Sequence, residues 1–549
     1  MCAVSANHKG TLPYVHRSRG YRSKGLWGDA SILDWFRLSV ASSPDKCAVV
    51  DRLGRSLTFR DLDREAAKLA TWMIDHKLRA GDVVGVQLPN WCEFTVVYVA
   101  CLKVGATINP LPTNLRISEL TDAVRQCQTA MTFHPTKFRN TEYEDLVVQL
   151  HKNSVSIKES VLVDRLGIPS RSFPTLSRIV DTSRPLPKSR EHVGGGDSIA
   201  AVLFTSGSES APKGVMLSHN NLIASERSFV SSLNVTWADS MFMPAPVGHA
   251  TGFMHGVTMP LIAQITSVLC DCTTANEMVM MLSESRATGG MAVPAIAATI
   301  LDYCVETGRG LPSLRFMCCG GSPVPRDLVR RARDVGINLY SVYGSTESAP
   351  HTMTTSCDSV ERVSETDGRP CWGTEVKVVD PETRQEVPQG QPGEEASRGP
   401  AVFSGYLNKP DLTARVLDDD GWYYSGDICV MDSEGYIRIV GRIKDTVIRG
   451  GENIGAGEVE SILRAYPRIG DAAVIGVDDP LLGQRLCACL VSRDGEEITV
   501  PELRSYFISG GYAKIKIPEK VVMLTELPLT PSGKVSKGDL RRMFGSGTC

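Results

Sequence analysis

The chain lacks the features that mark several large classes of protein. Its formal net charge of −3 over 549 residues is too small for a general nucleic-acid binder. No apolar run approaches the ~20 residues of a membrane span, and the longest, Phe94 to Leu102, ends at Lys103. The 16 cysteines include no Cys-x-x-Cys pair. We therefore expect no nucleic-acid partner, no transmembrane segment, and cysteines that are mostly small buried residues in a reducing compartment.

Two common nucleotide-binding patterns are also missing, namely Gly-x-x-x-x-Gly-Lys-Ser/Thr and Gly-x-Gly-x-x-Gly. A different phosphate-binding pattern is present. An apolar run at Ile199–Phe204, expected to be a buried strand, leads into a turn that extends to Gly214 and is rich in hydroxyl groups and glycine. Small residues let backbone N–H groups face phosphate oxygens, and Lys213 adds positive charge. This loop predicts a site for a nucleoside triphosphate.

The spacing of apolar residues predicts an α/β fold in at least two domains, because 549 residues exceed one compact core. From Ser56 to Arg330, short apolar strands alternate with helical periods, which is typical of layered and largely parallel sheets. Elements expected there are helices at Phe59–Asp75 and Glu93–Val104 and strands at Val83–Gln87 and Gly105–Asn109. The stretch Asn153–Gly196 contains several prolines and ends in glycines, which predicts a surface connection.

The C-terminal part has a different pattern. Residues 374–440 contain strand-like runs at Glu375–Val379 and Tyr436–Val440 between Gly/Pro turns, which predicts a β-rich subdomain. We place the domain boundary at 441–445, so that residues 1–440 form a large N-terminal domain and 446–549 a small α+β domain. In the small domain we expect helices at Glu458–Ala465 and Val500–Ile508 and strands at Ala472–Val477, Arg485–Val491 and Val521–Leu524.

Two short segments contain groups that suit a nucleotide. Tyr343 offers a flat ring to a base, Thr346 a hydroxyl to a phosphate, and Glu347 a carboxylate to Mg²⁺. The alternative for Glu347 is an ordinary acidic residue at a helix N-terminus. In the second segment, Tyr424 to Asp427, the carboxylate of Asp427 could accept both hydroxyls of a ribose. The alternative there is a common turn aspartate.

Two further segments combine lysine with glycine. The first, from Gly441 to Ile454, is charged and lies at the expected domain boundary, so it predicts either a hinge or a solvated linker. The second is Pro531-Ser532-Gly533-Lys534, where the residue types alone indicate ordinary surface charge.

With Gly320-Gly321-Ser322-Pro323 and the stretch Gly393 to Tyr406, these segments resemble the motifs of the adenylate-forming superfamily. That superfamily includes acyl-CoA synthetases, adenylation domains of peptide synthetases and beetle luciferases. The resemblance covers the chain from Leu57 to Lys537, with the motifs in the family's order. The chain is most similar to bacterial short- and medium-chain fatty-acid and cyclohexanecarboxylate CoA ligases. The resemblance implies the adenylate-forming enzyme fold and a cytoplasmic monomer or homodimer that uses ATP, Mg²⁺ and CoA.

The resemblance also assigns roles to individual residues. Those implied to bind ATP are Thr205, Ser206, Gly207, Ser208, Lys213, Gly214, Gly320, Gly321, Ser322, Tyr343, Gly344, Ser345, Thr346, Asp427, Arg442 and Lys534. Those implied to be catalytic are Lys534, Glu347 and Thr346, with Glu347 also the Mg²⁺ ligand. Those implied to line the acyl pocket are His249, Phe253, Ala295 and Gly321. Those implied to contact CoA are Arg449, Gly450 and Gly451, and Lys444 is the implied hinge of a mobile small domain.

The chemistry explains why such residues are needed. A carboxylate is a poor electrophile, and transfer of AMP to it creates a mixed anhydride with a good leaving group. Two anions must meet in that step, so Lys534 and Mg²⁺ supply positive charge. A thiol must then reach the same carbonyl, which a swing of the small domain about Lys444 would allow. The alternative acceptor is a carrier protein loaded by a stand-alone adenylation enzyme.

Some residues depart from the family pattern or leave a choice open. Ser210 stands where the phosphate loop usually has glycine, which costs about 1–2 kcal/mol if that position needs positive φ.

His249 could be a structural histidine, but the resemblance favours a gate at the acyl pocket. No Asp or Glu lies between Met241 and Ile262, which disfavours an amino-acid substrate. The basic residues near the N-terminus indicate a solvated arm rather than a targeting segment.

Overall fold

The computed structural model describes residues 12–165, 168–205, 212–321, 324–449, 452–479, 482–510, 512, 514–530 and 533–545. Contacts divide the chain into two compact units. The first unit comprises Met1–Thr205, Pro212–Val376 and Ser397–Tyr423, and the second comprises Ser206–Ala211, Lys377–Ala396 and Tyr424–Cys549. The hinge expected at residues 441–445 lies within the second unit of this division and stays a prediction.

A nine-stranded sheet forms one layer of the first unit. Its strands, in spatial order, are β17 (Arg369–Pro370), β16 (Ala349–Met353), β15 (Leu339–Ser345), β14 (Phe316–Gly320), β13 (Gly289–Ala292), β11 (Ser240–Met243), β12 (Thr266–Leu269), β1 (Cys47–Asp51) and β2 (Ser56–Thr58). The strands from β15 to β1 run parallel. At the edges, β16 is antiparallel to β15, β17 to β16 and β2 to β1. The carboxyl ends of the parallel strands therefore meet at one edge of the sheet, where ligand sites are common.

A seven-stranded sheet forms a second layer of the same unit. Its strands, in spatial order, are β20 (Gly405–Tyr406), β10 (Lys213–Ser218), β9 (Ile199–Thr205), β4 (Thr107–Pro110), β3 (Val83–Val86), β5 (Met131–Pro135) and β8 (Glu159–Val163). Strands β9, β4, β3, β5 and β8 are parallel, and β10 pairs antiparallel with both β9 and β20. A separate short hairpin joins β6 (Lys137–Phe138) to β7 (Thr141–Glu142).

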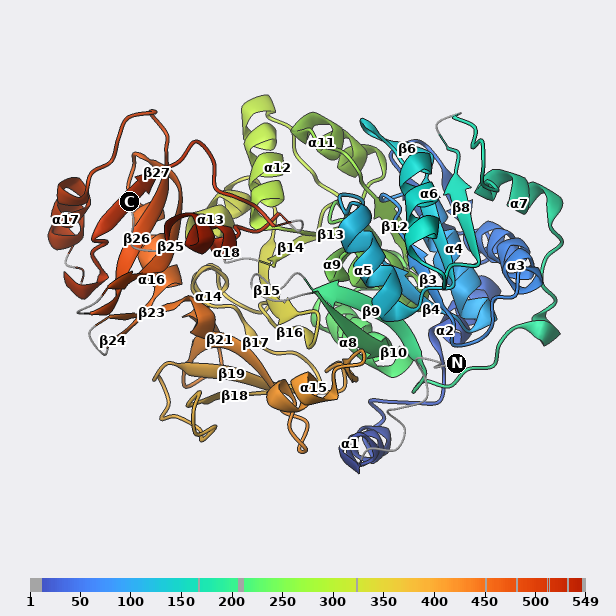
Figure 1. Cartoon of the computed structure of the whole chain (residues 1–549), viewed down its shortest axis with the longest axis horizontal. Helices are drawn as coiled ribbons and strands as arrows, with labels where there is room; N and C mark the ends of the chain where they lie inside the picture. Colours follow the sequence, from blue (N-terminus) through green and yellow to red (C-terminus); the bar gives the residue numbers. More distant parts are fainter. Residues whose placement is uncertain are drawn as a thin grey trace. The chain divides into compact units, whose positions relative to one another are not determined.

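Helices pack between and around these sheets (Figure 1). Helix α4 (Cys92–Val104) is buried at every position and packs against β3 and β4 of one sheet and β1 of the other. The remaining helices of the unit are α1 (Leu12–Ser23), α2 (Ile32–Ser42), α3 (Phe59–Asp75), α5 (Ile117–Cys127), α6 (Glu144–Asn153), α7 (Leu176–Thr182), α8 (His219–Ser232), α9 (Ala250–Phe253), α10 (Met259–Ala263), α11 (Ala275–Glu284), α12 (Pro294–Thr307), α13 (Arg326–Asp334), α14 (Val360–Glu365) and α15 (Pro410–Val416). The expected α/β class with layered sheets is confirmed.

Local sequence signals explain several of these elements. Thr58 and Asp61 form a capping box at the start of α3, which is amphipathic along its length and spans the expected residues. The expected surface connection at Asn153–Gly196 is wrong in part, because it contains the sheet strand β8 and helix α7. The apolar part of β8 is only Val161–Val163, and the prolines that follow it concealed the signal.

The second unit contains two smaller sheets. A four-stranded sheet, mainly in this unit, has the order β18 (Glu375–Val379), β19 (Gly393–Arg398), β21 (Tyr423–Met431) and β22 (Ile437–Arg442). A five-stranded sheet contains β24 (Glu452–Gly455), β23 (Thr446–Arg449), β26 (Gly483–Ser492), β25 (Ile469–Asp479) and β27 (Lys520–Met523), and its helices are α16 (Ala456–Arg464), α17 (Val500–Ser509) and α18 (Lys537–Phe544). The strands β25 and β26 are longer than expected, and β23 and β24 form a hairpin in a segment whose alternatives were a hinge or a linker.

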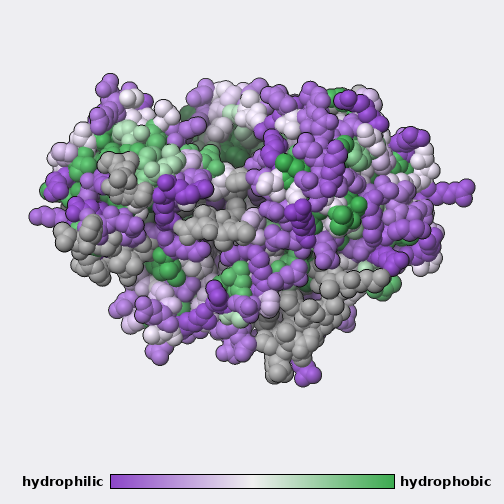
Figure 2. Space-filling view, in the orientation of Figure 1, coloured by the Kyte–Doolittle hydropathy of each residue, from purple (hydrophilic) through white to green (hydrophobic). Residues whose placement is uncertain are grey.

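Apolar residues are largely withdrawn from the surface. Figure 2 shows a face on which hydrophilic side chains predominate and hydrophobic ones form small separate patches. No helix in the described part of the chain combines the length and apolar character needed to cross a bilayer. Most of the described cysteines are buried and all of these are free thiols, as expected.

Candidate active site

The phosphate loop is the connection of a β-hairpin. Strands β9 and β10 pair antiparallel with Thr205 opposite Lys213 and Phe204 opposite Gly214. The two flanking residues of the loop are thus held side by side by the sheet. The loop residues Ser206, Gly207, Ser208 and Ser210 lie outside the described residues, so their expected roles stay predictions.

A chain of contacts leads from the base of this loop to Glu347. The Lys213 ammonium lies 5.2 Å from the centre of the Tyr406 ring, a cation–π arrangement. The Tyr406 hydroxyl donates a 2.8 Å hydrogen bond to Oε1 of Glu347. Burial and the neighbouring Glu347 carboxylate raise the pKa of Tyr406, so its phenol stays a hydrogen-bond donor at neutral pH. The structure therefore brings Lys213 to the ring and Glu347 to the hydroxyl of one buried tyrosine.

Thr346 and Glu347 occupy a tight turn. Residues 346–348 connect β15 to β16, so Glu347 is not the helix N-terminal residue of the alternative reading. Ser345 and Ser348 share a 3.0 Å hydrogen bond across the turn, and the Phe403 N–H donates to the Glu347 carbonyl oxygen at 2.7 Å. A Cβ on Gly344 would overlap the Ala349 carbonyl oxygen, which makes glycine necessary there. The turn holds the Glu347 side chain in a buried and well-defined position.

Glycines form the carboxyl end of the neighbouring strand β14. An added Cβ on Gly320 would overlap the Val342 carbonyl oxygen, and Gly321 has a φ of +84°, a conformation that favours glycine. Strand β14 pairs with β15, so Gly320 lies beside Val342 and one position from half-buried Tyr343. These residues therefore end at the same sheet edge, whereas Ser322 lies outside the described residues.

The residues expected at the acyl pocket have different exposures. His249 is half-buried and precedes α9, and Ala295 is exposed in the first turn of α12. The side chain of Val293, at the N-cap of α12, lies near Gly321. Phe253 is fully buried and packs edge-to-face on Tyr98 of α4, with ring centres 5.0 Å apart. Phe253 thus belongs to the apolar core behind His249.

The second unit holds the residues expected at the ribose. Asp427 on β21 and Arg442 on β22 are cross-strand partners, and Arg442 Nε lies 2.6 Å from Asp427 Oδ1. The Asp427 side chain is buried, whereas 62% of the Arg442 side chain is exposed. The preceding Gly426 has a φ of +74° and donates its N–H to Glu394 at 2.9 Å. Burial raises the pKa of the Glu394 carboxyl.

The expected hinge residue Lys444 is exposed in a single 3-10 turn between β22 and β23. Its carbonyl oxygen accepts a 3.1 Å hydrogen bond from Arg541 of α18. The same guanidinium pairs with Asp445 at 2.9 Å, and Lys537 pairs with Asp445 at 3.5 Å. The C-terminal side of this turn is therefore tied to α18, the helix that begins just after Lys534.

Lys534 follows a turn in which Gly533 has a φ of +80°. The Thr530 N–H donates to the Lys534 carbonyl oxygen at 2.6 Å, and the residue is exposed. Arg449, expected to contact CoA, lies on β23 and pairs with Glu519 at 2.6 Å, while Gly450 and Gly451 lie outside the described residues. The structure therefore presents Lys534 on an exposed turn and gives Arg449 a partner within its own unit.

Three buried residues near these sites were not predicted from the sequence. Tyr406 was noticed only as part of a motif, and its bond to Glu347 joins residues that no local pattern connects. Asn90 and Glu226 are also buried and bond the segment around His249. No sequence signal marks Glu226, because it lies in the polar-rich helical run His219–Ser232 and its burial is seen only in the structure.

The chain is similar to known proteins over most of its length. The AMP-binding enzyme family model matches residues 36–407, and the model of the AMP-binding enzyme C-terminal domain matches residues 458–534. A medium-chain fatty-acid–CoA ligase of Escherichia coli (strain K12) is 45% identical, over 98% of this chain and 94% of its own. A feruloyl-CoA synthase of Amycolatopsis is 32% identical, over 90% of this chain and 95% of its own. The crystal structure of ATP-bound MatB from Rhodopseudomonas palustris superposes with a TM-score of 0.84 at 27% identity, covering 94% of this chain and 99% of that one.

The chain belongs to the AMP-binding enzyme family. This confirms the resemblance, the fold class and the enzyme class inferred from the sequence, which is that of AMP-forming acid:CoA ligases.

Proposed function

We propose that this chain activates a medium-chain carboxylic acid with ATP and transfers the acyl group to CoA. In the first half-reaction, a carboxylate oxygen attacks the α-phosphorus of ATP, the bond to the β-phosphate breaks, and acyl-AMP and pyrophosphate form. In the second, the CoA thiol releases its proton to water, its sulfur attacks the acyl carbon, and AMP leaves as the bond between that carbon and the AMP oxygen breaks. The products of the two steps are acyl-CoA, AMP and pyrophosphate.

The contacts from Lys213 through Tyr406 to Glu347 give the main support for the first half-reaction. Lys213 closes the loop that would hold the departing pyrophosphate, and Glu347 would hold the metal that screens the phosphates. The Tyr406 phenol fixes one Glu347 oxygen by a hydrogen bond, so the carboxylate is oriented before the nucleotide arrives. Orientation in advance lowers the cost of reorganisation during the reaction.

The donor set at Glu347 fits Mg²⁺. Mg²⁺ in nucleotide enzymes is commonly bound by one or two carboxylates together with phosphate oxygens and water. Tyr406 uses one acceptor position of the Glu347 carboxylate, which has about four. Bound there, Mg²⁺ would neutralise phosphate charge as it develops, and Thr346 would donate a hydroxyl to the α-phosphate.

We assign the remaining roles to the second unit. The Asp427 carboxylate would accept the ribose hydroxyls, with Arg442 holding it in place at 2.6 Å. Lys534 would supply positive charge between the substrate carboxylate and the α-phosphate. A rotation about Lys444 would then remove Lys534 and bring residues 449–451 to the thiol. Arg541 bonds Lys444 and Asp445 and so ties the C-terminal side of the 3-10 turn 443–445 to α18. A pivot is therefore favoured on the side of this turn that follows β22.

Two observations support a medium-chain acid as the substrate. A full-length relative at 45% identity is a medium-chain fatty-acid–CoA ligase. The segment from Met241 to Ile262 contains no Asp or Glu that could hold a substrate amine, and Val293 and Ala295 at the start of α12 are apolar. A chain of methylene groups suits such surroundings because each buried methylene contributes about 0.8 kcal/mol.

The test is ATP–pyrophosphate exchange with butanoate, octanoate, dodecanoate and cyclohexanecarboxylate, followed by product analysis with CoA. We expect octanoate to give the highest kcat/KM and to yield octanoyl-CoA, AMP and pyrophosphate. Acyl-AMP that accumulates while CoA stays unreacted would contradict the ligase function and favour a carrier protein as the acceptor.

A further inference from the structure

Residues 244–258, called here the acyl wall, connect β11 to α10 and include His249. The wall is tightly fitted to the backbone around it. A Cβ on Gly248 would overlap the backbone of Leu111 and Pro112, and a Cβ on Gly252 would overlap the Pro246 carbonyl oxygen. The first approach limits movement of the wall against Leu111 and Pro112, and the second, which lies within the wall, limits changes in its internal fold. Its position therefore depends on what holds its two ends.

Asn90 holds the upstream end. This buried side chain lies in the connection between β3 and α4, in the other sheet layer. Its Nδ2 donates to the carbonyl oxygens of Met243 at 3.0 Å, Ala245 at 2.9 Å and Cys270 at 3.0 Å. Its Oδ1 accepts the Val247 N–H at 2.9 Å. One amide thus ties the ends of β11 and β12 to the first residues of the wall.

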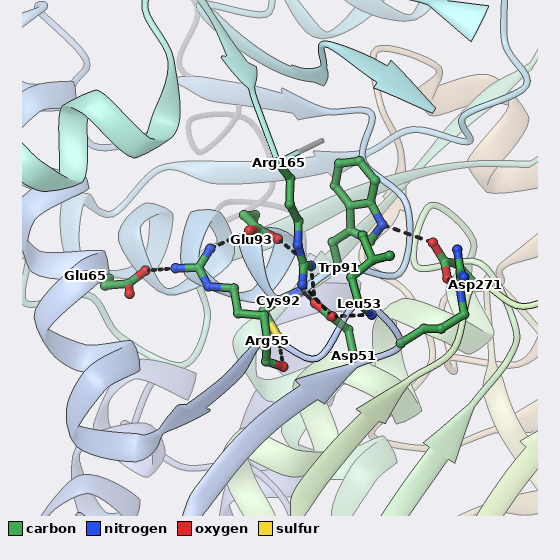
Figure 3. Close-up of polar contacts among 10 residues, drawn as sticks. Asp51, Leu53, Arg55, Glu65, Trp91, Cys92, Glu93, Arg165 and Asp271 are labelled. Atoms are coloured by element: carbon green, nitrogen blue, oxygen red, sulfur yellow. Dashed lines mark hydrogen bonds and ion pairs between the residues drawn. The ribbon is translucent and has the colours of Figure 1, made fainter. Parts of the chain in front are cut away.

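A buried ion cluster fixes the residues that follow Asn90 (Figure 3). The Trp91 indole N–H donates to Asp271 at 3.0 Å, and the Cys92 N–H donates to Asp51 at 2.9 Å. Arg165 pairs with Asp51 and also lies 3.2 Å from Glu93. Figure 3 shows these side chains converging at the start of α4. Asn90 is therefore held on a rigid support.

The downstream end of the wall is a π-helix, Met254–Thr258, inserted between α9 and α10. A π-turn carries one more residue per turn than an α-turn and is costly unless its surroundings stabilise it, which is why such turns are frequent at functional sites. The Ser267 hydroxyl donates to the Gly256 carbonyl oxygen at 2.5 Å. The π-helix directly follows α9, whose N-cap residue is His249.

Glu226 and His255 form the main side-chain contact of this π-helix. His255 Nδ1 lies 2.8 Å from Glu226 Oε2, and both residues are almost completely buried. The His255 ring also stacks on Phe229 of the same helix α8, with ring centres 4.3 Å apart and planes 23° apart. The second Glu226 oxygen accepts a 2.9 Å hydrogen bond from Ser225. The ring is thus held at its edge and on its face by one helix.

We propose that Asn90 and the Glu226–His255 pair are positioning residues that fix the acyl wall and thereby set the chain-length selectivity of the enzyme. This inference rests on the proposed function, because His249 is assigned to the acyl pocket there. The three residues act through the backbone of the wall rather than by contact with substrate. A fixed wall limits the depth available to the acid, and one methylene in an apolar pocket changes kcat/KM by about 10-fold or more.

The first experiment compares His255→Phe with the double variant Glu226→Leu/His255→Phe. Phenylalanine keeps a ring against Phe229 and removes the hydrogen bond, but it leaves a buried carboxylate without its partner. The double variant removes that carboxylate as well, and an apolar pair of similar volume commonly restores stability. In the double variant we expect the ratio of kcat/KM for octanoate to that for dodecanoate to fall by about 10-fold, with the KM for ATP unchanged.

Two further variants separate positioning from general stability. Glu226→Gln keeps the shape and an acceptor for the His255 ring and should retain the wild-type ratio. Glu191→Gln is the matched control, because Glu191 is also buried in the same unit and pairs with Lys103 at 2.6 Å. It should lower the melting temperature without changing the ratio. Asn90→Asp, which replaces a donor with a carboxylate facing three carbonyl oxygens, should change the ratio in the same direction as the double variant.

Hydrogen exchange of peptides covering residues 244–258 gives a readout that needs no activity. Faster exchange of this segment in the double variant than in Glu191→Gln is the expected result. An unchanged selectivity ratio in a folded double variant, or a rise in the KM for ATP as large as the change in the ratio, would overturn the inference. If the wild type activates no acid, the proposed function fails. The hydrogen-exchange comparison remains a separate test, because equal exchange of residues 244–258 in the double variant and in Glu191→Gln would overturn the role of these residues in holding the wall.

Discussion

The Tyr406 hydroxyl donates a 2.8 Å hydrogen bond to Glu347 Oε1 across a separation of 59 residues in sequence. Tyr406 lies on β20, which pairs with β10, the strand that begins with Lys213. Glu347 lies in the turn between β15 and β16 of the other sheet. One phenol thus joins the two sheets beside Lys213.

Tyr406→Phe should weaken Mg²⁺-dependent activation. Loss of the hydroxyl frees the Glu347 carboxylate to rotate, and a hydrogen bond to a charged group contributes about 1.5–3 kcal/mol. We expect kcat for pyrophosphate exchange to fall about 10-fold and the Mg²⁺ concentration for half-maximal rate to rise. Tyr143→Phe is the control, because its hydroxyl donates to the Thr113 carbonyl oxygen at 2.9 Å elsewhere in the same unit. Equal losses in both variants would contradict a role for Tyr406 at the metal site.

Asp427→Asn should raise the KM for ATP with little change in the KM for the acid. The amide has one acceptor oxygen in place of two, and it carries no charge to pair with Arg442, which lies 2.6 Å from Asp427 in the wild type. We expect an increase in the KM for ATP of about 10-fold or more, as for the loss of a hydrogen bond to a charged group. Glu375→Gln, which breaks the exposed pair with Arg398 at 2.6 Å, should change neither KM. A rise in both KM values for Asp427→Asn would place the residue elsewhere.

Lys534→Ala should separate the two half-reactions. Removing the ammonium leaves two anions unscreened in the first step, so pyrophosphate exchange should fall by at least about 100-fold. Thioester formation from supplied octanoyl-AMP should stay within about twofold, because Lys534 has no role in it. Lys516→Ala, which removes a lysine that pairs with Glu458 in the same unit, is the control. Equal losses in both half-reactions would refute the rotation of the small domain.

Stability should fall on the acid side of neutrality because of His219. The Ile32 N–H donates to Nδ1 of this buried ring at 3.3 Å, which requires that nitrogen to be unprotonated. Burial lowers the pKa of His219 from 6.5 to about 4. As pH falls below about 6.5, the unfolded chain takes up the proton first, so the stabilisation present above that pH is lost progressively down to about pH 4.

Urea unfolding at about pH 7 and pH 5 measures this effect. A loss of about 2 kcal/mol is expected for the wild type between these values, since each pKa unit corresponds to about 1.4 kcal/mol. His219→Gln should be less stable at pH 7 and should lose less stability on acidification. A variant with the wild-type pH dependence would show that other groups cause the loss.

The sequence predicted the regular elements best where a local signal is strong. Helix α3 has a capping box and a continuous apolar face, and its bounds at Phe59–Asp75 match the expectation. The sequence did not predict the hairpin of β23 and β24, and it left a hinge or a linker as the alternatives. Charged residues flank the connection of this hairpin, and its stability comes from pairing with the opposite strand. Strand β8 was missed because a short apolar run beside prolines resembles a loop.

The candidate site was predicted as far as its motifs extend. The resemblance assigns roles to Glu347, Asp427 and Lys534 because each lies in a short segment with a fixed order of residue types, and these roles stay predictions. It could not identify Tyr406, Asn90 or Glu226 as supporting residues, because their partners are distant in sequence and single buried polar residues form no pattern. Their roles depend on packing between layers, which only the fold specifies.

The most direct test of the central claim follows carboxylate oxygen through the reaction. The wild type is incubated with ATP, Mg²⁺, CoA and octanoate carrying oxygen-18 in both carboxylate positions, and the products are analysed by mass spectrometry. Attack of the carboxylate on the α-phosphorus predicts one labelled oxygen in AMP, one in octanoyl-CoA and none in pyrophosphate. Unlabelled AMP, or ADP together with labelled phosphate, would contradict activation through acyl-AMP.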